Sequence, residues 1–360
     1  MPREVQAFAP GRVNLIGEHT DYNGGLALPF AIAEGVTVSA RATNERTSRA
    51  VSEESIRAHA RDLAEDDEFA LANPQHVAGW RAFVRGTAAE LRATGAPIPA
   101  AELEIRGEVP RGAGLSSSAA LEVALAVALL DLADAKLDRL ALARLCSRVE
   151  NDWVGARTGL LDQLASLFGE ADTALCIDFS SLTIERVPLI LRDGWRLVTV
   201  DSGERRQLAA SGYNERRVEC AYACELLGIG SLRELEGLDG GPSRALARLP
   251  ARLARRARHV LHENERVLAT VAALRAGDLP QVGRLLDASH TSLRDQYECS
   301  TPAVEAAVDR LRHSGAAGAR MIGGGFGGHV LGLFAPDSRP PRGARAVHPS
   351  AGAHILRARA

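Results

Sequence analysis

Lysine is almost missing from this sequence, and its scarcity excludes one kind of nucleotide site. Lys136 is the only lysine, so arginine supplies nearly all the positive charge. A P-loop needs a lysine directly after its last glycine, whereas Lys136 follows an alanine. A Walker-type nucleotide site is therefore excluded. We interpret the excess of arginine and alanine as a compositional bias rather than a function.

Cysteine and long apolar runs are also scarce. The sequence has 5 cysteines, which match no zinc or redox spacing, and we expect free thiols in a reducing compartment. Its longest apolar stretch, residues 119–130, is interrupted by Glu122 and is too short to span a bilayer. The N-terminus lacks a charged segment followed by an apolar run. We therefore expect a cytoplasmic protein that has no membrane partner.

The net charge is small as well. A formal charge of −2 at pH 7 gives no electrostatic reason to expect nucleic acid as a partner. The arginine-rich segment at 247–267 has apolar residues at helical spacing, which favours an amphipathic helix with a basic face. Hydrophobic residues make up 46% of the 360 residues, so the chain can form two domains that each bury a core.

The most informative stretch is residues 11–25, which read GRVNLIGEHTDYNGG. After Leu15 and Ile16, Gly17 breaks a strand, and a dense polar cluster follows without apolar periodicity. Carboxylates accept hydrogen bonds from hydroxyls, whereas imidazole and guanidinium donate, so this loop suits a hydroxyl-rich small molecule. The alternative is a polar surface loop, but the density of the cluster directly after an apolar run argues against it.

A second stretch, residues 110–120, reads PRGAGLSSSAA and leads into an apolar run. This pattern is typical of a loop that feeds a helix N-terminus, and we expect a buried helix at 119–132. Such a terminus binds phosphate because its unpaired N–H groups and its dipole point at the anion. The serine hydroxyls have three possible roles: to cap the helix, to ligate Mg²⁺ or to contact phosphate. A flexible lead-in to an N-cap is the structural alternative.

Two acids flank a glycine-rich connection further along the chain. Glu150 ends a helix expected at 139–150, and Asp162 follows after Gly155 and Gly159. Such a connection can bring both carboxylates to one site, where Mg²⁺ and a hydroxyl substrate each need one. The alternatives are a solvated glutamate at a helix end and an aspartate that simply begins the next helix.

The remaining pattern is that of an α+β protein. Strands are expected at 6–9, 27–40, 103–105, 173–179 and 197–200, with helices at 75–91 and 213–227. Residues 52–67 are polar and acidic, and we expect them at the surface. Pro188 and a turn at 192–194 indicate a boundary, which gives domains at 1–185 and 186–360. Residues 323–328, GGGFGG, lie between two strand-like segments and are compatible with a hairpin turn.

These motifs, in this order, resemble those of galactokinases, a branch of the GHMP small-molecule kinases. Residues 11–25 resemble the galactokinase signature, and residues 110–120 resemble the second GHMP motif, PxGxGLSSSAA. The glycine run at 323–328 resembles the third motif, and RHVLHENERV at 258–267 and GAHIL at 352–356 are also galactokinase-like. The resemblance covers nearly the whole chain.

The resemblance implies a fold and an activity. Galactokinases have two α+β domains with the active site between them: an N-terminal ribosomal protein S5 domain 2-like domain and a C-terminal ferredoxin-like domain. The final strand is able to pack back on the N-terminal domain. The enzymes transfer the γ-phosphoryl group of MgATP to the anomeric hydroxyl of α-D-galactose. Since they are often monomers, we expect a monomer whose partners are D-galactose, ATP and Mg²⁺.

Individual roles follow from the matching positions. Asp162 matches the catalytic base, and Arg12 matches the cation beside it. Ser118 and Glu150 match ligands of Mg²⁺. The positions that match sugar contacts are Glu18, His19, Asp21, Gly159 and Tyr213. The loop that wraps the triphosphate consists of Gly112, Ala113, Gly114, Leu115, Ser116, Ser117 and Ser118.

The chain also departs from the family pattern. Only a short segment precedes Gly11, GLLDQ replaces GIMDQ around Asp162, His329 stands where cysteine is frequent, and DSGERRQLAASGY before Tyr213 is atypical. Two alternatives therefore stay open. One is a related sugar-1-kinase acting on N-acetylgalactosamine or L-arabinose. The other is a non-catalytic sensor of galactose and ATP; the polarity of EHTDY makes a mevalonate or homoserine kinase a poorer match.

Overall fold

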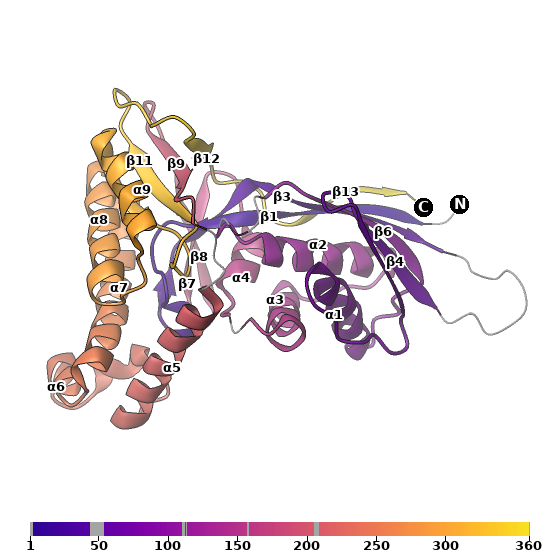
Figure 1. Ribbon diagram of the computed structural model, residues 1–360, viewed down its shortest axis with the longest axis horizontal. Coiled ribbons are helices and arrows are strands. Elements are labelled where there is room, and N and C mark those ends of the chain that lie inside the picture. Colours follow the sequence, from indigo (N-terminus) through magenta and orange to yellow (C-terminus); the bar gives the residue numbers. More distant parts are fainter. Residues whose placement is uncertain are drawn as a thin grey trace, which may run out of the picture.

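The computed structural model describes residues 3–43, 54–109, 112, 114–156, 158–204 and 209–359. The molecule is elongated, with a lobe of strands and helices toward each end of its long axis (Figure 1). Both lobes combine helices with largely antiparallel sheets, which confirms the α+β prediction. No helix in the described part of the chain combines the length and the apolar character that a membrane span requires.

The first lobe is built on a six-stranded sheet in the order β13-β1-β3-β6-β4-β5. Its strands are β1 (Glu4–Asn14), β3 (Pro29–Ala42), β4 (Ser55–Ala60), β5 (Glu65–Ala70), β6 (Ala101–Gly107) and β13 (His354–Arg359). All neighbours are antiparallel except β4 and β6. The last strand lies beside the first, so segments far apart in the sequence share this sheet (Figure 1).

Helices cover one face of this sheet (Figure 1). They are α1 (Trp80–Ala93), α2 (Ser117–Leu132), α3 (Arg139–Arg148) and α4 (Leu161–Phe168). Helix α2 is buried along most of its length and packs on β1 and β3, because it is apolar on almost all sides. Strand alternation directs Val38, Leu103 and Ile105 into the same core.

The second lobe contains a four-stranded antiparallel sheet in the order β10-β11-β9-β12. Its strands are β9 (Arg196–Asp201), β10 (Ala316–Met321), β11 (His329–Phe334) and β12 (Arg345–Val347). Its helices are α5 (Ala209–Leu227), α6 (Gly241–Ala247), α7 (Ala251–Ala276), α8 (Leu279–Asp295) and α9 (Pro302–His313). A three-stranded sheet of β2 (Leu26–Ala27), β7 (Thr173–Asp178) and β8 (Thr183–Pro188) lies where the lobes meet (Figure 1).

An apolar cluster, here called the joining core, connects the lobes. It contains Val13 and Leu15 from the first lobe together with Val267 of α7 and Ile322 of the second. Burial of such surface contributes roughly 25 cal/mol per Å², so the two lobes stabilise each other. The boundary predicted between residues 185 and 186 falls inside β8 and stays a prediction.

Two segments differ from the sequence predictions. The segment at 52–67, predicted only as polar surface, includes β4 and the start of β5, which form a hairpin. Ile56 and Ala58 face the core while charged neighbours face solvent, and these charges hid the alternation. The helix predicted at 139–150 ends at Arg148, and a π-helical turn, η2 (Val149–Val154), follows and carries Glu150.

Candidate active site

The polar loop after β1 is shaped by a glycine and by the second lobe. Leu15 and Ile16 are fully buried, and Gly17 follows with a φ of 96°. A Cβ atom on Gly17 would lie 2.5 Å from the carbonyl oxygen of Leu26, so only glycine fits there. The Gly17 N–H donates to the carboxylate of Glu263 on α7 over 3.1 Å. The residues that follow therefore turn toward the second lobe.

A small pocket, here called the polar pocket, opens where this loop meets the second lobe. Its volume of about 210 Å³ lies below the range typical of drug-sized ligands. It brings together the residues predicted as base, adjacent cation and sugar contacts: Arg12, Glu18, His19, Asp21, Gly159, Asp162 and Tyr213. Gly323, Gly324 and Gly325, from the loop between β10 and β11, complete the wall.

Arg12 and Asp162 form the charged centre of the polar pocket. The guanidinium Nε donates to Asp162 Oδ1 over 2.7 Å, and Nη2 lies 2.6 Å from the same oxygen. Nη1 donates to the carbonyl oxygen of Gly114 over 2.6 Å. Burial lowers the pKa of Arg12, but the charges of Asp162 and Glu18 outweigh burial and raise it, so Arg12 stays a cation.

The glycine–serine loop leads into the N-terminus of α2, as the pattern predicts. Gly112 and Gly114 have φ values of 72° and 76°, and Ser116 is the N-cap residue with a φ of 66°. The Ser116 side chain does not cap the helix, and its hydroxyl instead donates to Asp162 Oδ2 over 2.5 Å. Its oxygen therefore does not satisfy the first-turn N–H groups of α2, which can face an anion.

Ala113 and Leu115 differ from the other residues of this loop. Ala113, predicted to contact the triphosphate, lies outside the described residues. Leu115 is buried in the joining core, and its carbonyl oxygen accepts from the Arg12 N–H over 3.1 Å. The Leu115 side chain thus anchors the loop, and only its backbone is available to a ligand.

Ser118 and Glu150 lie next to each other beside the loop. The Ser118 hydroxyl donates to Glu150 Oε1 over 2.9 Å, and Thr158 Oγ1 donates to Oε2 over 2.7 Å. Burial, and next the charge of Asp162, raise the pKa of Glu150, and these hydrogen bonds oppose the increase. A hydroxyl and a carboxylate fit Mg²⁺, which in kinases takes few protein ligands and shares the substrate phosphates. Within the described residues, no group of three or more His, Cys, Asp or Glu side chains offers an all-protein metal site.

Asp21 lies near the other acids of the polar pocket. Burial, and next the charge of Asp162, raise the pKa of Asp21 to about 7, and Glu18 adds to the shift while Arg217 opposes it. Among the described residues that line the pocket, the carboxyl groups of Glu18, Asp21 and Asp162 lie beside one guanidinium, that of Arg12. Such a lining suits a neutral molecule with several hydroxyls and disfavours an anionic one.

Glu18 is held in place by the second lobe. Its Oε1 accepts from the Gly323 N–H over 2.6 Å and lies 3.3 Å from Nη2 of Arg320. Arg320 is fully buried and donates to the carbonyl oxygens of Asn14 and Leu15, each over 2.9 Å. The third glycine motif, given a structural role by the sequence analysis, therefore also orients Glu18. Sequence reasoning missed Arg320, and its place just before the glycine run was the available signal.

Aromatic side chains surround His19. Its ring centroid lies 5.3 Å from that of Tyr213 and 4.4 Å from that of Tyr297. His19 Nδ1 is 2.8 Å from the Tyr22 hydroxyl, which is 2.8 Å from the Tyr297 hydroxyl. These contacts fix the imidazole at the pocket wall. Sequence reasoning missed Tyr297, which lies outside every recognised motif.

A second pocket, of about 290 Å³ and here called the apolar pocket, adjoins the glycine–serine loop. Ser117 and Ser118 line it together with apolar side chains: Val36, Trp80, Phe83, Ile105, Val109 and Leu121. Apolar and aromatic walls of this kind suit a flat heterocycle such as a nucleotide base. This pocket was not predicted from the sequence, although aromatic residues in the helix expected at 75–91 were a signal.

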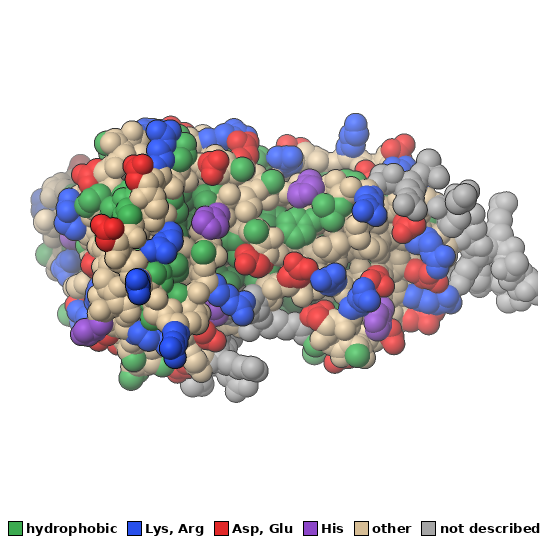
Figure 2. Space-filling view, turned by 90° about the horizontal axis from the view of Figure 1, so that it is seen from above, with side chains coloured by type: hydrophobic (Ala, Val, Ile, Leu, Met, Phe, Trp, Pro, Cys, Tyr) green, Lys and Arg blue, Asp and Glu red, His purple; other side chains and the backbone are tan. Residues whose placement is uncertain are grey.

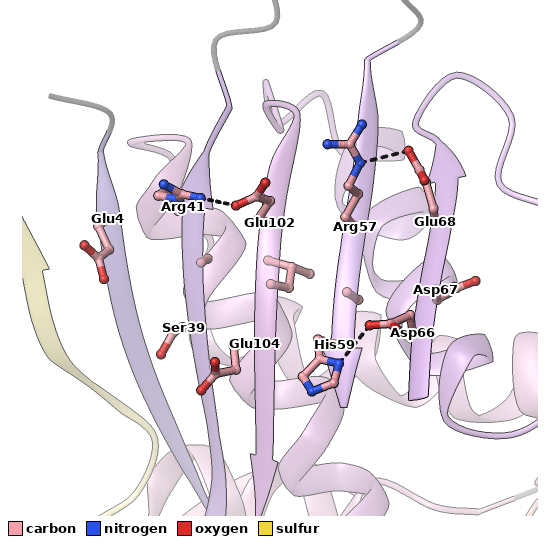
Figure 3. Close-up of a pocket in the computed structure, with 13 residues that line it drawn as sticks. Glu4, Ser39, Arg41, Arg57, His59, Asp66, Asp67, Glu68, Glu102 and Glu104 are labelled. Carbon is pink, nitrogen blue, oxygen red and sulfur yellow. Dashed lines mark hydrogen bonds and ion pairs between the residues drawn. The ribbon is translucent and has the colours of Figure 1, made fainter. Parts of the chain in front are cut away.

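A larger hollow, of about 700 Å³, lies on the outer face of the six-stranded sheet (Figure 3). Several of its charged side chains form exposed pairs: Arg41 with Glu102, Arg57 with Glu68 and His59 with Asp66 (Figure 3). Seen from above, acidic and basic side chains are interspersed over this end of the molecule (Figure 2). Exposed pairs contribute little energy, and none of the predicted site residues lines this hollow, so we assign the chemistry to the smaller pockets.

Comparison with known families agrees with this geometry. The model of the galactokinase galactose-binding signature matches residues 2–42. Models of the GHMP kinases N terminal domain and of the GHMP kinases C terminal match residues 82–170 and 270–354. The fold and these matches are those of a GHMP small-molecule kinase.

Curated relatives show to which branch of the GHMP kinases the chain belongs. The chain is 41% identical over 328 residues to a galactokinase of Thermotoga petrophila, an alignment that covers 91% of this chain and 88% of the relative. It is 44% identical over 339 residues to a galactokinase of Mycobacterium bovis, with 92% and 90% covered. The chain belongs to the galactokinase family, which confirms the resemblance found in the sequence.

Solved structures agree. The crystal structure of Lactococcus lactis galactokinase complexed with galactose matches with a TM-score of 0.87 and 33% identity, covering 98% of this chain and 95% of that one. Methanococcus jannaschii mevalonate kinase matches with a TM-score of 0.65 at 18% identity, covering 98% of both chains. The second match shows a shared fold alone.

Proposed function

We propose that the protein catalyses the galactokinase reaction, in which the γ-phosphoryl group of ATP moves to the anomeric C1 hydroxyl of α-D-galactose. The observation that carries the proposal is the Arg12–Asp162 pair, because it connects the polar pocket to the glycine–serine loop. Arg12 bonds to Gly114, and Ser116 bonds to Asp162. The relatives named above and the structure complexed with galactose support the same activity.

In this mechanism Asp162 accepts the proton of the C1 hydroxyl while the hydroxyl oxygen forms a bond to the γ-phosphorus. The bond between this phosphorus and the bridging oxygen breaks, and ADP leaves. Phosphoryl transfer passes through a loose transition state, so positioning and charge neutralisation do most of the work. Arg12 and the N-terminus of α2 supply positive charge and N–H donors, since no lysine is available there.

The polar pocket holds the sugar in our proposal. Glu18 and Asp21 accept hydrogen bonds from sugar hydroxyls. His19 and Tyr213, whose rings are neighbours in the pocket wall, contact the sugar ring. Gly159 leaves the space that the Asp21 carboxylate occupies. The three carboxyl groups in the described lining suit a neutral sugar with several hydroxyls, such as galactose.

The loop and the apolar pocket receive the nucleotide. Gly112, Ala113 and Gly114, with residues 115–118, wrap the triphosphate. Trp80 and Phe83 line the apolar pocket, which we assign to adenine. Ser118 and Glu150 are proposed to hold Mg²⁺, which when bound neutralises charge on the phosphate oxygens.

The test is ADP release from MgATP across a panel of D-galactose, D-glucose, N-acetylgalactosamine, L-arabinose, mevalonate and homoserine. Turnover that is strongest with galactose supports the proposal. Preferential turnover of N-acetylgalactosamine or L-arabinose would replace it with a related sugar-1-kinase. Absence of turnover, together with a galactose-dependent rise in melting temperature when ATP is present, would favour a sensor.

We further propose that the protein acts as a cytoplasmic monomer with domains at 1–185 and 186–360. Its 5 cysteines are all free, which supports a reducing compartment. The small net charge supports the absence of a nucleic-acid partner. Light scattering on the purified protein tests the monomer directly.

A further inference from the structure

Two buried polar side chains lie behind the glycine–serine loop and have no role in the mechanism above. Glu122 lies on α2, four residues after Ser118, and Gln163 lies on α4, directly after Asp162. Both side chains are completely buried. Burial of such groups is unfavourable unless they are hydrogen-bonded, so their partners indicate what they do.

Gln163 bridges the two buried acids. Its Nε2 lies 2.9 Å from Oε1 of Glu122 and 3.0 Å from Oε2 of Glu150. A side-chain amide carries two N–H donors, and here each is directed at a different carboxyl group. Gln163 thereby connects the helix that carries Ser118 to the turn that carries Glu150.

The remaining oxygen atoms of Glu122 and Gln163 do not stabilise the fold. Glu122 Oε2 and Gln163 Oε1 are buried and have no hydrogen-bond partner within the described residues. Apolar side chains of similar volume would avoid this loss, because a partly satisfied polar network is less favourable than an apolar core. The arrangement therefore points to control of the Glu150 carboxylate rather than to packing alone.

The surroundings explain why Glu150 needs such control. It lies on the π-helical turn η2, an irregularity that is frequent at functional sites. Thr158 and Ser118 each hold one of its oxygens. Burial, and next the charge of Glu150, raise the pKa of Glu122 well above its usual range.

We propose that Gln163, itself held by Glu122, is a positioning residue that orients the Glu150 carboxylate and couples it to the turn carrying Asp162. The inference rests on the proposed function, in which Glu150 binds the divalent cation. Removing a residue that hydrogen-bonds to a metal ligand typically changes metal affinity or activity by about 10- to 100-fold.

The experiment measures Mn²⁺ binding by paramagnetic resonance in the presence of a non-hydrolysable ATP analogue, together with kcat, sugar KM and melting temperature. Gln163→Met keeps the length of the side chain and removes both N–H donors. We expect the Mn²⁺ dissociation constant to rise about tenfold and kcat to fall, with the sugar KM within about threefold of wild type. Glu122→Met, which removes only the hold on Gln163, should shift Mn²⁺ binding in the same direction by less.

A matched control and a rescue separate positioning from packing. Ser166→Ala removes another buried hydrogen bond of α4, in which Oγ donates to the carbonyl oxygen of Pro10 over 2.8 Å. It should lower the melting temperature and leave Mn²⁺ binding unchanged. Glu122→Gln keeps the oxygen that accepts from Gln163 and should restore Mn²⁺ affinity to within about threefold of wild type.

The outcomes decide between the two proposals. If Gln163→Met only lowers the melting temperature, as Ser166→Ala does, the positioning role is overturned. If Glu122→Gln binds Mn²⁺ as poorly as Glu122→Met, the hold by Glu122 is overturned. If wild type phosphorylates none of the sugars but Mn²⁺ binding with the analogue still weakens in Gln163→Met, the proposed function fails and the positioning role stands.

Discussion

A Cβ atom on Gly159 would lie 2.0 Å from Oδ2 of Asp21. Because non-bonded atoms do not approach so closely, any side chain at position 159 displaces the Asp21 carboxylate. Gly159→Ala is therefore expected to raise the sugar KM by about tenfold or more and to leave the ATP KM nearly unchanged, since small misplacements at a site have large effects. Steady-state kinetics with each substrate varied in turn measures both constants.

The control for this variant is Gly237→Ala. A Cβ atom on Gly237 would meet no atom within 4 Å, and the residue is exposed at the end of the turn η3 (Leu232–Gly237), outside both pockets. It should keep both KM values. A wild-type sugar KM in Gly159→Ala would mean that Asp21 does not contact the sugar.

Asp162→Asn tests the base. The substitution keeps an oxygen for the Arg12 hydrogen bond, and the new NH₂ group can donate to the Ser116 hydroxyl, so the pocket should survive, but the amide cannot accept the proton. We expect kcat to fall by about 100- to 10,000-fold and sugar binding to stay within about tenfold. Asp162→Ala should also abolish turnover, at a greater cost in stability because buried Arg12 loses its partner. Turnover at the wild-type rate in Asp162→Asn would exclude Asp162 as the base.

Asp21 predicts a pH dependence of sugar binding. Its pKa is raised to about 7, so the carboxyl becomes protonated as the pH falls through neutrality and accepts sugar hydroxyls less well. The sugar KM should rise several-fold, up to about tenfold, from pH 8 to pH 6. Asp21→Asn should show a raised KM that no longer varies in this window, whereas an unchanged slope in the variant would assign the titration to another group.

Asp21 also affects the free energy of unfolding, and its effect changes with pH in the direction opposite to that of most aspartates. It binds its proton more tightly in the folded than in the unfolded chain, where the pKa is 3.8. Its contribution to the free energy of unfolding is therefore fully present below pH about 4 and is lost as the pH rises through about 7. Denaturant unfolding of wild type and Asp21→Asn at pH 5 and pH 8 measures this difference.

The parts of the site that the sequence predicts are those whose chemistry is local. Residues 11–25 and the glycine–serine loop carry their function in short, non-periodic runs, and the family they indicate is confirmed. Long-range partners could not be predicted in this way. Arg320 and Tyr297 lie in or next to ordinary helices and strands, and only the packing of the second lobe against the loop gives them a role.

The secondary structure was likewise predictable only in part. The apolar helix α2 was predictable from its composition alone, because it is buried on most sides. The hairpin of β4 and β5 was not, since its outward face is charged along its length and a polar segment of this kind reads as surface. The π-helical turn η2 was also missed, because its residues continue the pattern of α3.

Glu18→Ala should weaken sugar binding and stability together. Glu18 Oε1 accepts from the Gly323 N–H and lies beside Arg320, which is fully buried. Removing the carboxylate leaves this cation without its anionic neighbour, at a cost of about 3 kcal/mol in the free energy of unfolding. The sugar KM should rise more than the ATP KM, and Glu18→Gln should retain more of the stability. A larger rise in the ATP KM would contradict the sugar-site assignment.

The pKa of Glu263 predicts how low pH affects the stability of the polar loop after β1. Its carboxylate accepts from Gly17 over 3.1 Å, from Ser289 over 2.6 Å and from Arg266 over 2.6 Å. Burial alone would raise the pKa of Glu263, but the charges of Arg266 and His259 outweigh it and lower the pKa to about 2. Because the folded pKa lies below the unfolded value of 4.5, the carboxylate stabilises the protein above pH about 4.5, and this contribution is lost as the pH falls toward 2.

Glu263→Gln isolates this contribution. The amide keeps one acceptor for Gly17 but removes the charge, so at pH 7 the variant should lose about 3 kcal/mol in the free energy of unfolding. The difference from wild type should shrink as the pH is lowered from 5 to 3, because wild type then loses the same stabilisation. Denaturant unfolding from pH 5 to pH 3 measures the difference between the variant and wild type. A difference that stays constant with pH would show that the charge of Glu263 does not stabilise the loop. Glu265→Gln, a change of an exposed glutamate on the same helix, is the matched control and should leave stability unchanged at every pH.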